Sequence, residues 1–193
     1  HHHKLIAIVA SCTHVEEVRS IEEMVFKLTG SQQIKENALK LAAKIKREIN
    51  KQYPYIKCSI GIGPNTFISK VTSNMQKPDG CVVIEQHEIP HRLLALKLRD
   101  LNGIGRQMEA RLAHYGISTV EPLYAANKGQ LRTAWGNVEG ERMYDKLRGL
   151  EPHYVKNARS SLGHSHVLPP EQRFRSTMET ISTTSECTDW DWR

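Results

Sequence analysis

The sequence contains no long hydrophobic run and no closely spaced pair of cysteines. No apolar segment approaches the roughly 20 residues that cross a bilayer, and the first residues lack the charged and apolar regions of a signal peptide. The sequence contains four cysteines, which are widely separated: Cys12, Cys58, Cys81 and Cys187. Their spacing favours neither a zinc site nor a secreted disulfide framework. These absences predict a protein of the reducing cytoplasm that has no membrane segment.

A strong excess of charge of one sign is also absent. The chain of 193 residues carries 27 basic and 21 acidic side chains, a formal net charge of +6. This mild excess suits a polyanionic partner, but it is common among proteins that have none. A hydrophobic content of 39% is enough for a packed core, in one ordinary domain or two small ones.

The first half of the chain alternates helical and extended patterns. A helical pattern begins at the first residue with no N-cap residue before it, which predicts a chain cut inside a domain. His1 to His3 either end an affinity tag or open this helix. The spacing then predicts, in order, a strand over 15–21, a strand over 24–28, a helix from 34 to 49, a strand over 57–62, a helix over 66–75 and a strand over 81–84. The order predicts an α+β fold in which helices cover a sheet.

Strand signals end near residue 90. Nearly everything from 91 to 150 can be helical, and residues beyond Pro170 are rich in Ser, Thr and Glu without periodicity. We therefore expect a first domain over 1–90, a small all-helical domain over 91–160, and a linker with a loosely held tail over 161–193. The tail carries no evident motif for a protein partner.

Two glycines interrupt the helical pattern at residues 101–105, whose sequence is LNGIG. A helix-hairpin-helix uses such glycines to turn tightly and approach a phosphate, while amides at the start of the next helix point at the anion. The alternative is a plain connector between two helices, but Arg106 and other nearby basic residues favour contact with the DNA backbone. A similar segment over 136–140 is weaker, and there we expect ordinary helix packing.

Two adjacent carboxylates, Glu22 and Glu23, lie between the first two predicted strands. Carboxylate oxygens at a strand end suit a hard cation such as Mg²⁺. Taken alone, such a pair is more often a solvated turn. The apolar residues on both sides predict a buried hairpin.

The segment at residues 58–80, CSIGIGPNTFISKVTSNMQKPDG, favours the metal site over the solvated turn. It resembles the stretch of Y-family translesion DNA polymerases, of the bacterial polymerase IV and V type, in which a palm strand leads through a glycine turn into a helix. RSIEEM at 19–24 is similar to the metal motif of that family, and LNGIG to its thumb hairpin. SLGHSHVLPPE at 161–171 resembles the link beyond the thumb, so the likeness covers about residues 1–172.

The resemblance implies a partial palm in 1–90, a thumb in 91–160 and a role for several residues. Glu22 and Glu23 would hold catalytic Mg²⁺, Lys70 would contact the triphosphate of an incoming deoxynucleotide, and Lys77 is a weaker phosphate candidate. The DNA backbone would lie against Gly103, Ile104, Gly105 and Arg106. Without the resemblance, Lys70 is an exposed helix lysine.

The chain also departs from the family pattern. Glu22 stands where the family has Asp, and one extra methylene moves a carboxylate by about 1.5 Å. The first metal-binding Asp, the steric-gate aromatic residue and the fingers would all precede His1. We therefore expect the chain to be inactive alone. It is either part of a translesion polymerase that performs template-directed nucleotidyl transfer, or a non-catalytic DNA-binding module with the same fold. A helical partner-binding domain unrelated to DNA is the third reading.

Overall fold

A computed structural model describes residues 2–152. The predicted linker and tail over 161–193, with the link motif at 161–171, lie outside the described residues. We refer to residues 2–90 as the first part and to residues 91–152 as the helical part. None of the helices described is long and apolar enough to cross a membrane.

The first part follows the predicted order of elements. The elements are α1 (His2–Ala10), β1 (Glu17–Ser20), β2 (Glu23–Val25), the 3-10 helix η1 (Gly30–Gln33), α2 (Lys35–Gln52), β3 (Ile60–Ile62), α3 (Thr66–Met75) and β4 (Cys81–Val83). Every predicted helix and strand is present, although the strands are shorter than the extended patterns suggested. A strand ends where its ladder of hydrogen bonds ends, and the apolar pattern continues beyond that point.

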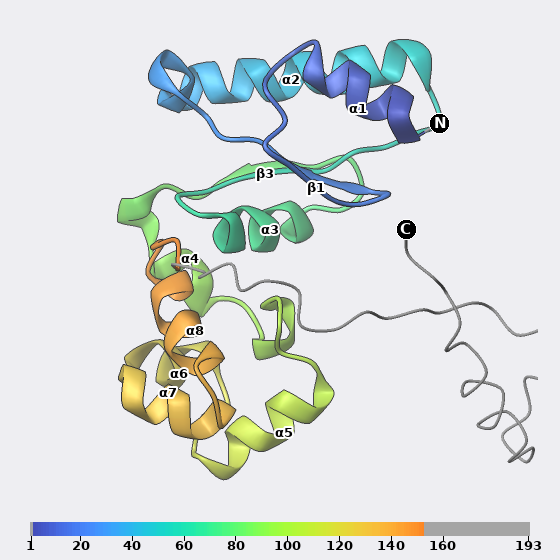
Figure 1. The fold of residues 1–193 in the computed structure, drawn as a ribbon. Coiled ribbons are helices and arrows are strands. Elements are labelled where there is room, and N and C mark those ends of the chain that lie inside the picture. Colours follow the sequence, from blue (N-terminus) through green and yellow to red (C-terminus); the bar gives the residue numbers. More distant parts are fainter. Residues whose placement is uncertain (1, 153–193) are drawn as a thin grey trace, which may run out of the picture. The chain divides into compact units, whose positions relative to one another are not determined.

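The strands form two small ribbons in place of one sheet. Strands β1 and β2 pair antiparallel, with Glu17 opposite Val25, while β3 and β4 pair parallel, with Ile60 opposite Cys81. A parallel pair needs a crossover connection, and α3 supplies it. Figure 1 shows α1 and α2 on one side of the strands and α3 on the other.

The prediction of a buried hairpin at β1 and β2 is wrong. All four side chains of β1 are exposed, and Ile21 in the turn is 69% exposed. A two-stranded ribbon buries only the side that meets a helix. Met24 of β2 packs against the core beside α1 and α2, while β1 lies outside it.

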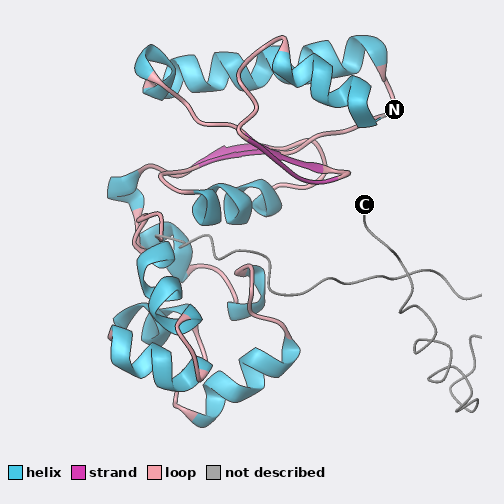
Figure 2. Ribbon diagram, in the orientation of Figure 1, coloured by secondary structure: helices cyan, strands magenta, loops and turns pink. Residues whose placement is uncertain are grey.

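The helical part contains no strand among residues 91–152, as predicted (Figure 2). The 3-10 helix η2 (Gln86–Glu88) leads into it. Its elements are α4 (His91–Leu94), the 3-10 helix η3 (Leu98–Asp100), α5 (Arg106–His114), α6 (Val120–Ala125), α7 (Lys128–Trp135) and α8 (Glu139–Leu147). With the first part, this gives the predicted α+β fold. The domain limits at 90 and 160 stay a prediction.

Two hydrophobic cores hold these elements together. One core joins α1, α2 and β3 through buried residues such as Ile8, Ile45 and Ile60. The other fills the helical part, and it also takes in Phe67, Ile68 and Val71 from α3. Helix α3 therefore packs its apolar face with the helical part, although it is a crossover between two strands of the first part.

Candidate functional site

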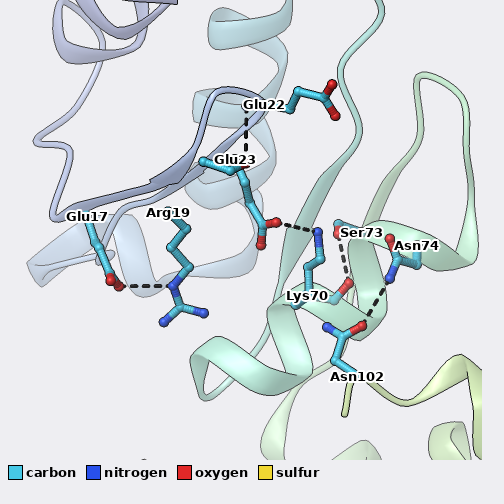
Figure 3. A network of polar contacts seen from close by, with 9 residues as sticks. Glu17, Arg19, Glu22, Glu23, Lys70, Ser73, Asn74 and Asn102 are labelled. Atoms are coloured by element: carbon cyan, nitrogen blue, oxygen red, sulfur yellow. Dashed lines mark hydrogen bonds and ion pairs between the residues drawn. The ribbon is translucent and has the colours of Figure 1, made fainter. Parts of the chain in front are cut away.

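Two of the residues singled out by the sequence meet directly. Glu23 begins β2, and Lys70 lies on α3, 47 residues further along the chain. The Lys70 Nζ is 2.8 Å from Oε2 of Glu23, and the two side chains are 30% and 33% exposed (Figure 3). The fold thus brings a predicted phosphate ligand and a predicted metal ligand together as an ion pair open to solvent on one side.

Glu22 does not join this pair. Its residue lies in the turn before β2, where its backbone N–H donates to Ser20 Oγ at 3.2 Å. Figure 3 shows its carboxylate directed away from that of Glu23. Within residues 2–152 there is no group of three His, Cys, Asp or Glu side chains that could hold a metal ion. The carboxylates of Glu22 and Glu23 do not converge here, so a metal held by either would need further ligands (Figure 3).

Helix α3 owes its place to glycines on the strand beside it. A Cβ built on Gly61 would lie 2.0 Å from the carbonyl oxygen of Ser69 and 2.3 Å from the backbone nitrogen of Ser73. A Cβ on Gly63 would lie 2.7 Å from the Ile68 side chain. Only glycine allows the helix to lie this close to β3. The glycines in the motif thereby allow α3, which carries Lys70, to pack closely on β3.

The predicted hairpin lies next to the end of α3. The Asn74 side-chain amide donates to Asn102 Oδ1 at 3.5 Å, which links α3 to the loop before α5 (Figure 3). Ile104 is buried at 3% exposure and anchors the loop in the core. Gly103 has a φ of +91°, a region that favours glycine.

The loop leaves the start of α5 open. Gly105 is the N-cap, and no side chain caps this end of the helix. A Cβ on Gly105 would meet no atom within 4 Å. The amides of the first helical turn and the exposed Arg106 therefore face a space that an anion can enter. The φ of Gly105 is −87°, which any residue adopts, so the backbone conformation does not require glycine here. What glycine provides is the open space in front of the helix.

Lys77 stands apart from these groups. It lies exposed in the turn after α3 and makes no ion pair within the described residues. The same turn is tied to α2, because Asp79 pairs with Lys46 at 3.0 Å. This hydrogen-bonded pairing with Lys46 lowers the pKa of the Asp79 carboxyl. The turn is thus fixed on the α2 side, and the structure does not bring Lys77 to Glu23.

Sequence reasoning passed over one residue of this region. Asn65 precedes α3 and is only 5% exposed, and its Oδ1 accepts the Ile68 backbone N–H at 2.7 Å. An Asn directly before a helical pattern is an N-cap signal that the sequence does contain. Its remaining partners, described below, lie more than 80 residues away and leave no local signal.

Comparison with known families matches both parts of the chain. Residues 1–74 match the impB/mucB/samB family, and residues 99–151 match the family described as DNA polymerase-iota, thumb domain. The first match contains Glu22, Glu23 and Lys70, and the second contains the hairpin at 101–105.

Individual relatives agree with these matches. DNA polymerase IV of Moorella thermoacetica is 30% identical over 183 residues, covering 92% of this chain and 45% of the relative. DNA polymerase IV of Nitrosopumilus maritimus is 33% identical over 128 residues, covering 66% of this chain and 35% of the relative. The chain thus spans less than half the length of these relatives.

Solved structures give the same result. A structure described as an insertion ternary complex of Dbh DNA polymerase is similar with a TM-score of 0.69 and 26% identity, over 80% of this chain and 45% of the other. DinB from Sulfolobus solfataricus is similar with a TM-score of 0.67 and 25% identity, over 78% of this chain and 45% of the other.

Proposed function

Because the chain belongs to the Y-family of translesion DNA polymerases, of which it holds part of the palm and the thumb, we propose that it contributes to template-directed nucleotidyl transfer on damaged or primed DNA. In this proposal the first part supplies groups that face the incoming deoxynucleoside triphosphate. The helical part holds the DNA backbone. The whole activity belongs to a longer assembly than the residues described.

The contact between Lys70 and Glu23 carries the proposal. Two motifs that lie 47 residues apart converge within 2.8 Å, and α3 links them to the hairpin through Asn74 and Asn102. A lysine ammonium at this point can take a phosphate oxygen of the triphosphate, and it can neutralise charge that develops during phosphoryl transfer. Lys77 is a second, more remote candidate for a phosphate.

Contacts with DNA are assigned to the open start of α5. Its free amides, the turn at Gly103 to Gly105 and the cation of Arg106 suit phosphate oxygens, with the buried Ile104 fixing the loop. Contacts of this kind position the duplex and carry no sequence information.

We also propose a cytoplasmic location for the protein. The described cysteines form no disulfide with one another, which is compatible with a reducing compartment.

Mg²⁺ is the cation we propose for the complete site, because its ligands are carboxylate oxygens and substrate phosphates. Glu22 and Glu23 are the candidate ligands from this chain. Since the two carboxylates diverge here, further ligands and a turn of Glu22 are needed before a metal is held. We expect Mg²⁺ to bind the isolated chain weakly, and isothermal titration with and without Glu23→Gln measures this.

DNA binding tests the assignment of the helical part. The chain should bind a fluorescent duplex without sequence preference, and the logarithm of affinity should fall with the logarithm of salt by about 0.9 per neutralised phosphate. Anisotropy at several salt concentrations measures the slope. Binding that is selective for one sequence or insensitive to salt would contradict the proposal.

Nucleotide binding tests the assignment of Lys70. A fluorescent deoxynucleoside triphosphate should bind the chain with primed DNA, and Lys70→Gln should weaken this binding by about tenfold, the value of one charge-assisted hydrogen bond to a charged group. Lys40→Gln on the exposed face of α2 is the matched control and should have no effect. Equal affinity in the Lys70→Gln variant and the unaltered chain would remove Lys70 from the site.

Catalysis separates the polymerase reading from a non-catalytic DNA-binding module, which the relatives do not favour. The chain alone should not extend a primer with Mg²⁺ or Mn²⁺. Fusion of the upstream palm strand and fingers of a related polymerase should restore extension. Glu23→Ala in this fusion should abolish it, and Glu22→Asp should raise it. An active fusion that tolerates Glu23→Ala would exclude the carboxylate from the reaction.

A further inference from the structure

Asn65 forms a junction between α3 and α8. Besides capping α3, its side-chain amide nitrogen donates to the carbonyl oxygens of Lys146 at 2.9 Å and Leu150 at 2.8 Å. Its oxygen accepts from the Ile68 backbone N–H at 2.7 Å. A side chain that is 5% exposed thus uses its oxygen and both amide hydrogens on two different helices.

These partners lie at or near the ends of the two helices. Ile68 N–H belongs to the first turn of α3, and the carbonyls of Lys146 and Leu150 lie at and just beyond the last turn of α8. One buried amide therefore caps α3 and at the same time contacts the end of α8. Separating the two ends would leave the buried Asn65 amide nitrogen without its acceptors, which links α3 to the end of α8.

A second contact repeats this link at the surface. Glu151, just past α8, accepts hydrogen bonds from the backbone N–H of Thr66 at 3.0 Å and from its hydroxyl at 2.8 Å. Its negative charge also lies at the favourable N-terminal end of α3. The backbone leading to it fits closely, since a Cβ on Gly149 would lie 2.9 Å from Cγ of Pro64.

Other contacts of α3 point the same way, although the helix also packs on β3 at Gly61. Its apolar residues Phe67, Ile68 and Val71 belong to the core of the helical part, and Asn74 at its far end contacts Asn102 in the hairpin loop. Lys70 leaves the same helix toward Glu23 on β2. The helix that carries Lys70 is thus held by the helical part as well as by β3, while the partner of Lys70 lies on β2 of the first part.

We infer that Asn65 is a positioning residue for Lys70. By fixing α3 on the end of α8, it lets the helical part determine where the Lys70 ammonium stands relative to Glu23. The contacts establish this link by themselves. Its meaning for catalysis rests on the proposed function, in which Lys70 meets the triphosphate and the helical part meets DNA.

Asn65→Asp isolates this role from helix capping. Aspartate caps a helix as well as asparagine does, so α3 keeps its cap. The new carboxylate cannot donate, and it faces two carbonyl oxygens, so the link to α8 is lost. Asn127→Asp is the matched control, because Asn127 caps α7 through the Gln130 N–H at 2.9 Å and is exposed.

The measurement is the rate of reductive methylation of each lysine in the full chain, read by mass spectrometry. In the unaltered chain Lys70 should react slowly, because it is paired with Glu23. Asn65→Asp should increase the methylation rate of Lys70 by about threefold or more, the size expected when a partly exposed ion pair is released. Lys40 should keep its rate, and Asn127→Asp should change neither rate.

Glu23→Gln completes the test as a double-mutant cycle. Once Glu23 cannot pair, Lys70 is already released, and adding Asn65→Asp should give no further increase. An unchanged Lys70 rate in Asn65→Asp overturns the inference. An equal increase with and without Glu23→Gln also overturns it, because it indicates general loosening of α3.

Glu151→Ala serves if circular dichroism shows that Asn65→Asp does not fold. This exposed residue should give a smaller increase in the Lys70 rate, and no increase would contradict the inference. Failure of the proposed function is separate from these outcomes. It would appear as nucleotide affinity indifferent to Lys70→Gln, whereas the methylation rates decide the role of Asn65 without any nucleotide.

Discussion

The two glycine turns of the helical part have related sequences and opposite surroundings. The first, at 101–105, leads into α5, and a Cβ on Gly105 would meet no atom within 4 Å. The second joins α7 to α8, and a Cβ on Gly140 would lie 2.1 Å from the carbonyl oxygen of Leu131. The first glycine keeps space open toward solvent, while the second allows two helices to touch.

This difference separates a binding turn from a packing turn. Gly136 ends α7 with a φ of +74°, a common way to close a helix. The charges after it are used internally, since Glu139 pairs with Arg142 and, at 3.3 Å, with Lys146. At the first turn Arg106 makes no ion pair within the residues described. The expectation of ordinary packing at 136–140 is confirmed by the contact at Gly140.

The largest effect should come from Gly140→Ala. The new methyl group would collide with the backbone of α7, which cannot move aside as a side chain could. We expect a loss of about 3 kcal/mol in the free energy of unfolding, at the upper end of overpacking effects. Urea denaturation followed by circular dichroism measures this. A loss below about 1 kcal/mol would mean that α7 and α8 separate easily and that the turn is not held by packing.

Gly105→Ala should weaken DNA binding while affecting stability far less than Gly140→Ala does. The Gly105 φ of −87° tolerates alanine and the site is open, so the unfolding free energy should fall by only about 0.5 kcal/mol, the cost of alanine at an N-cap. The affinity for duplex DNA should fall about fivefold, close to 1 kcal/mol, because a methyl group keeps the phosphate from the backbone. Gly129→Ala on the exposed surface of α7 is the control. Unchanged affinity would show that no phosphate approaches this turn.

Arg106→Gln should have a smaller effect, confined to electrostatics. Loss of one phosphate contact should reduce the log-log salt slope of DNA binding by about 0.9. Arg132→Gln tests the other turn, where the guanidinium already pairs with Glu141 at 2.6 Å, and should leave the slope unchanged. If both variants change the slope equally, the two turns do not differ in their contact with DNA.

The smallest effect should be the response of the second turn to acid. Burial alone would raise the pKa of Glu139, but hydrogen bonds and charge from Arg142 and Lys146 outweigh it and hold the pKa below its ordinary value. Glu139→Gln should therefore cost about 0.5 kcal/mol at neutral pH, as for other exposed pairs. The depressed pKa means that this difference is lost as the pH falls through the pKa of the folded state. Denaturation at pH 7 and at pH 3 compares the two, and a difference that persists at pH 3 contradicts the assignment.

Much of the first part could be predicted from local sequence. The helix over 66–75 has the predicted bounds, because its apolar spacing is a local signal. The predicted burial of the β1 and β2 hairpin was wrong, since an apolar residue such as Ile21 can remain exposed at 69% where nothing packs on it. The carboxylates at 22 and 23 were correctly placed at a strand end, but only the backbone path decides which one faces Lys70.

The sequence by itself determined the order of the elements, the α+β class and the family, because periodicity, turn residues and motifs are read within short windows. The tertiary structure alone decided that Glu23 pairs with Lys70, that Asn65 links α3 to α8, and that one glycine turn is open and the other closed. Each of these depends on contacts between residues far apart in the chain. A local pattern fixes which residues share a face, whereas packing fixes what that face meets.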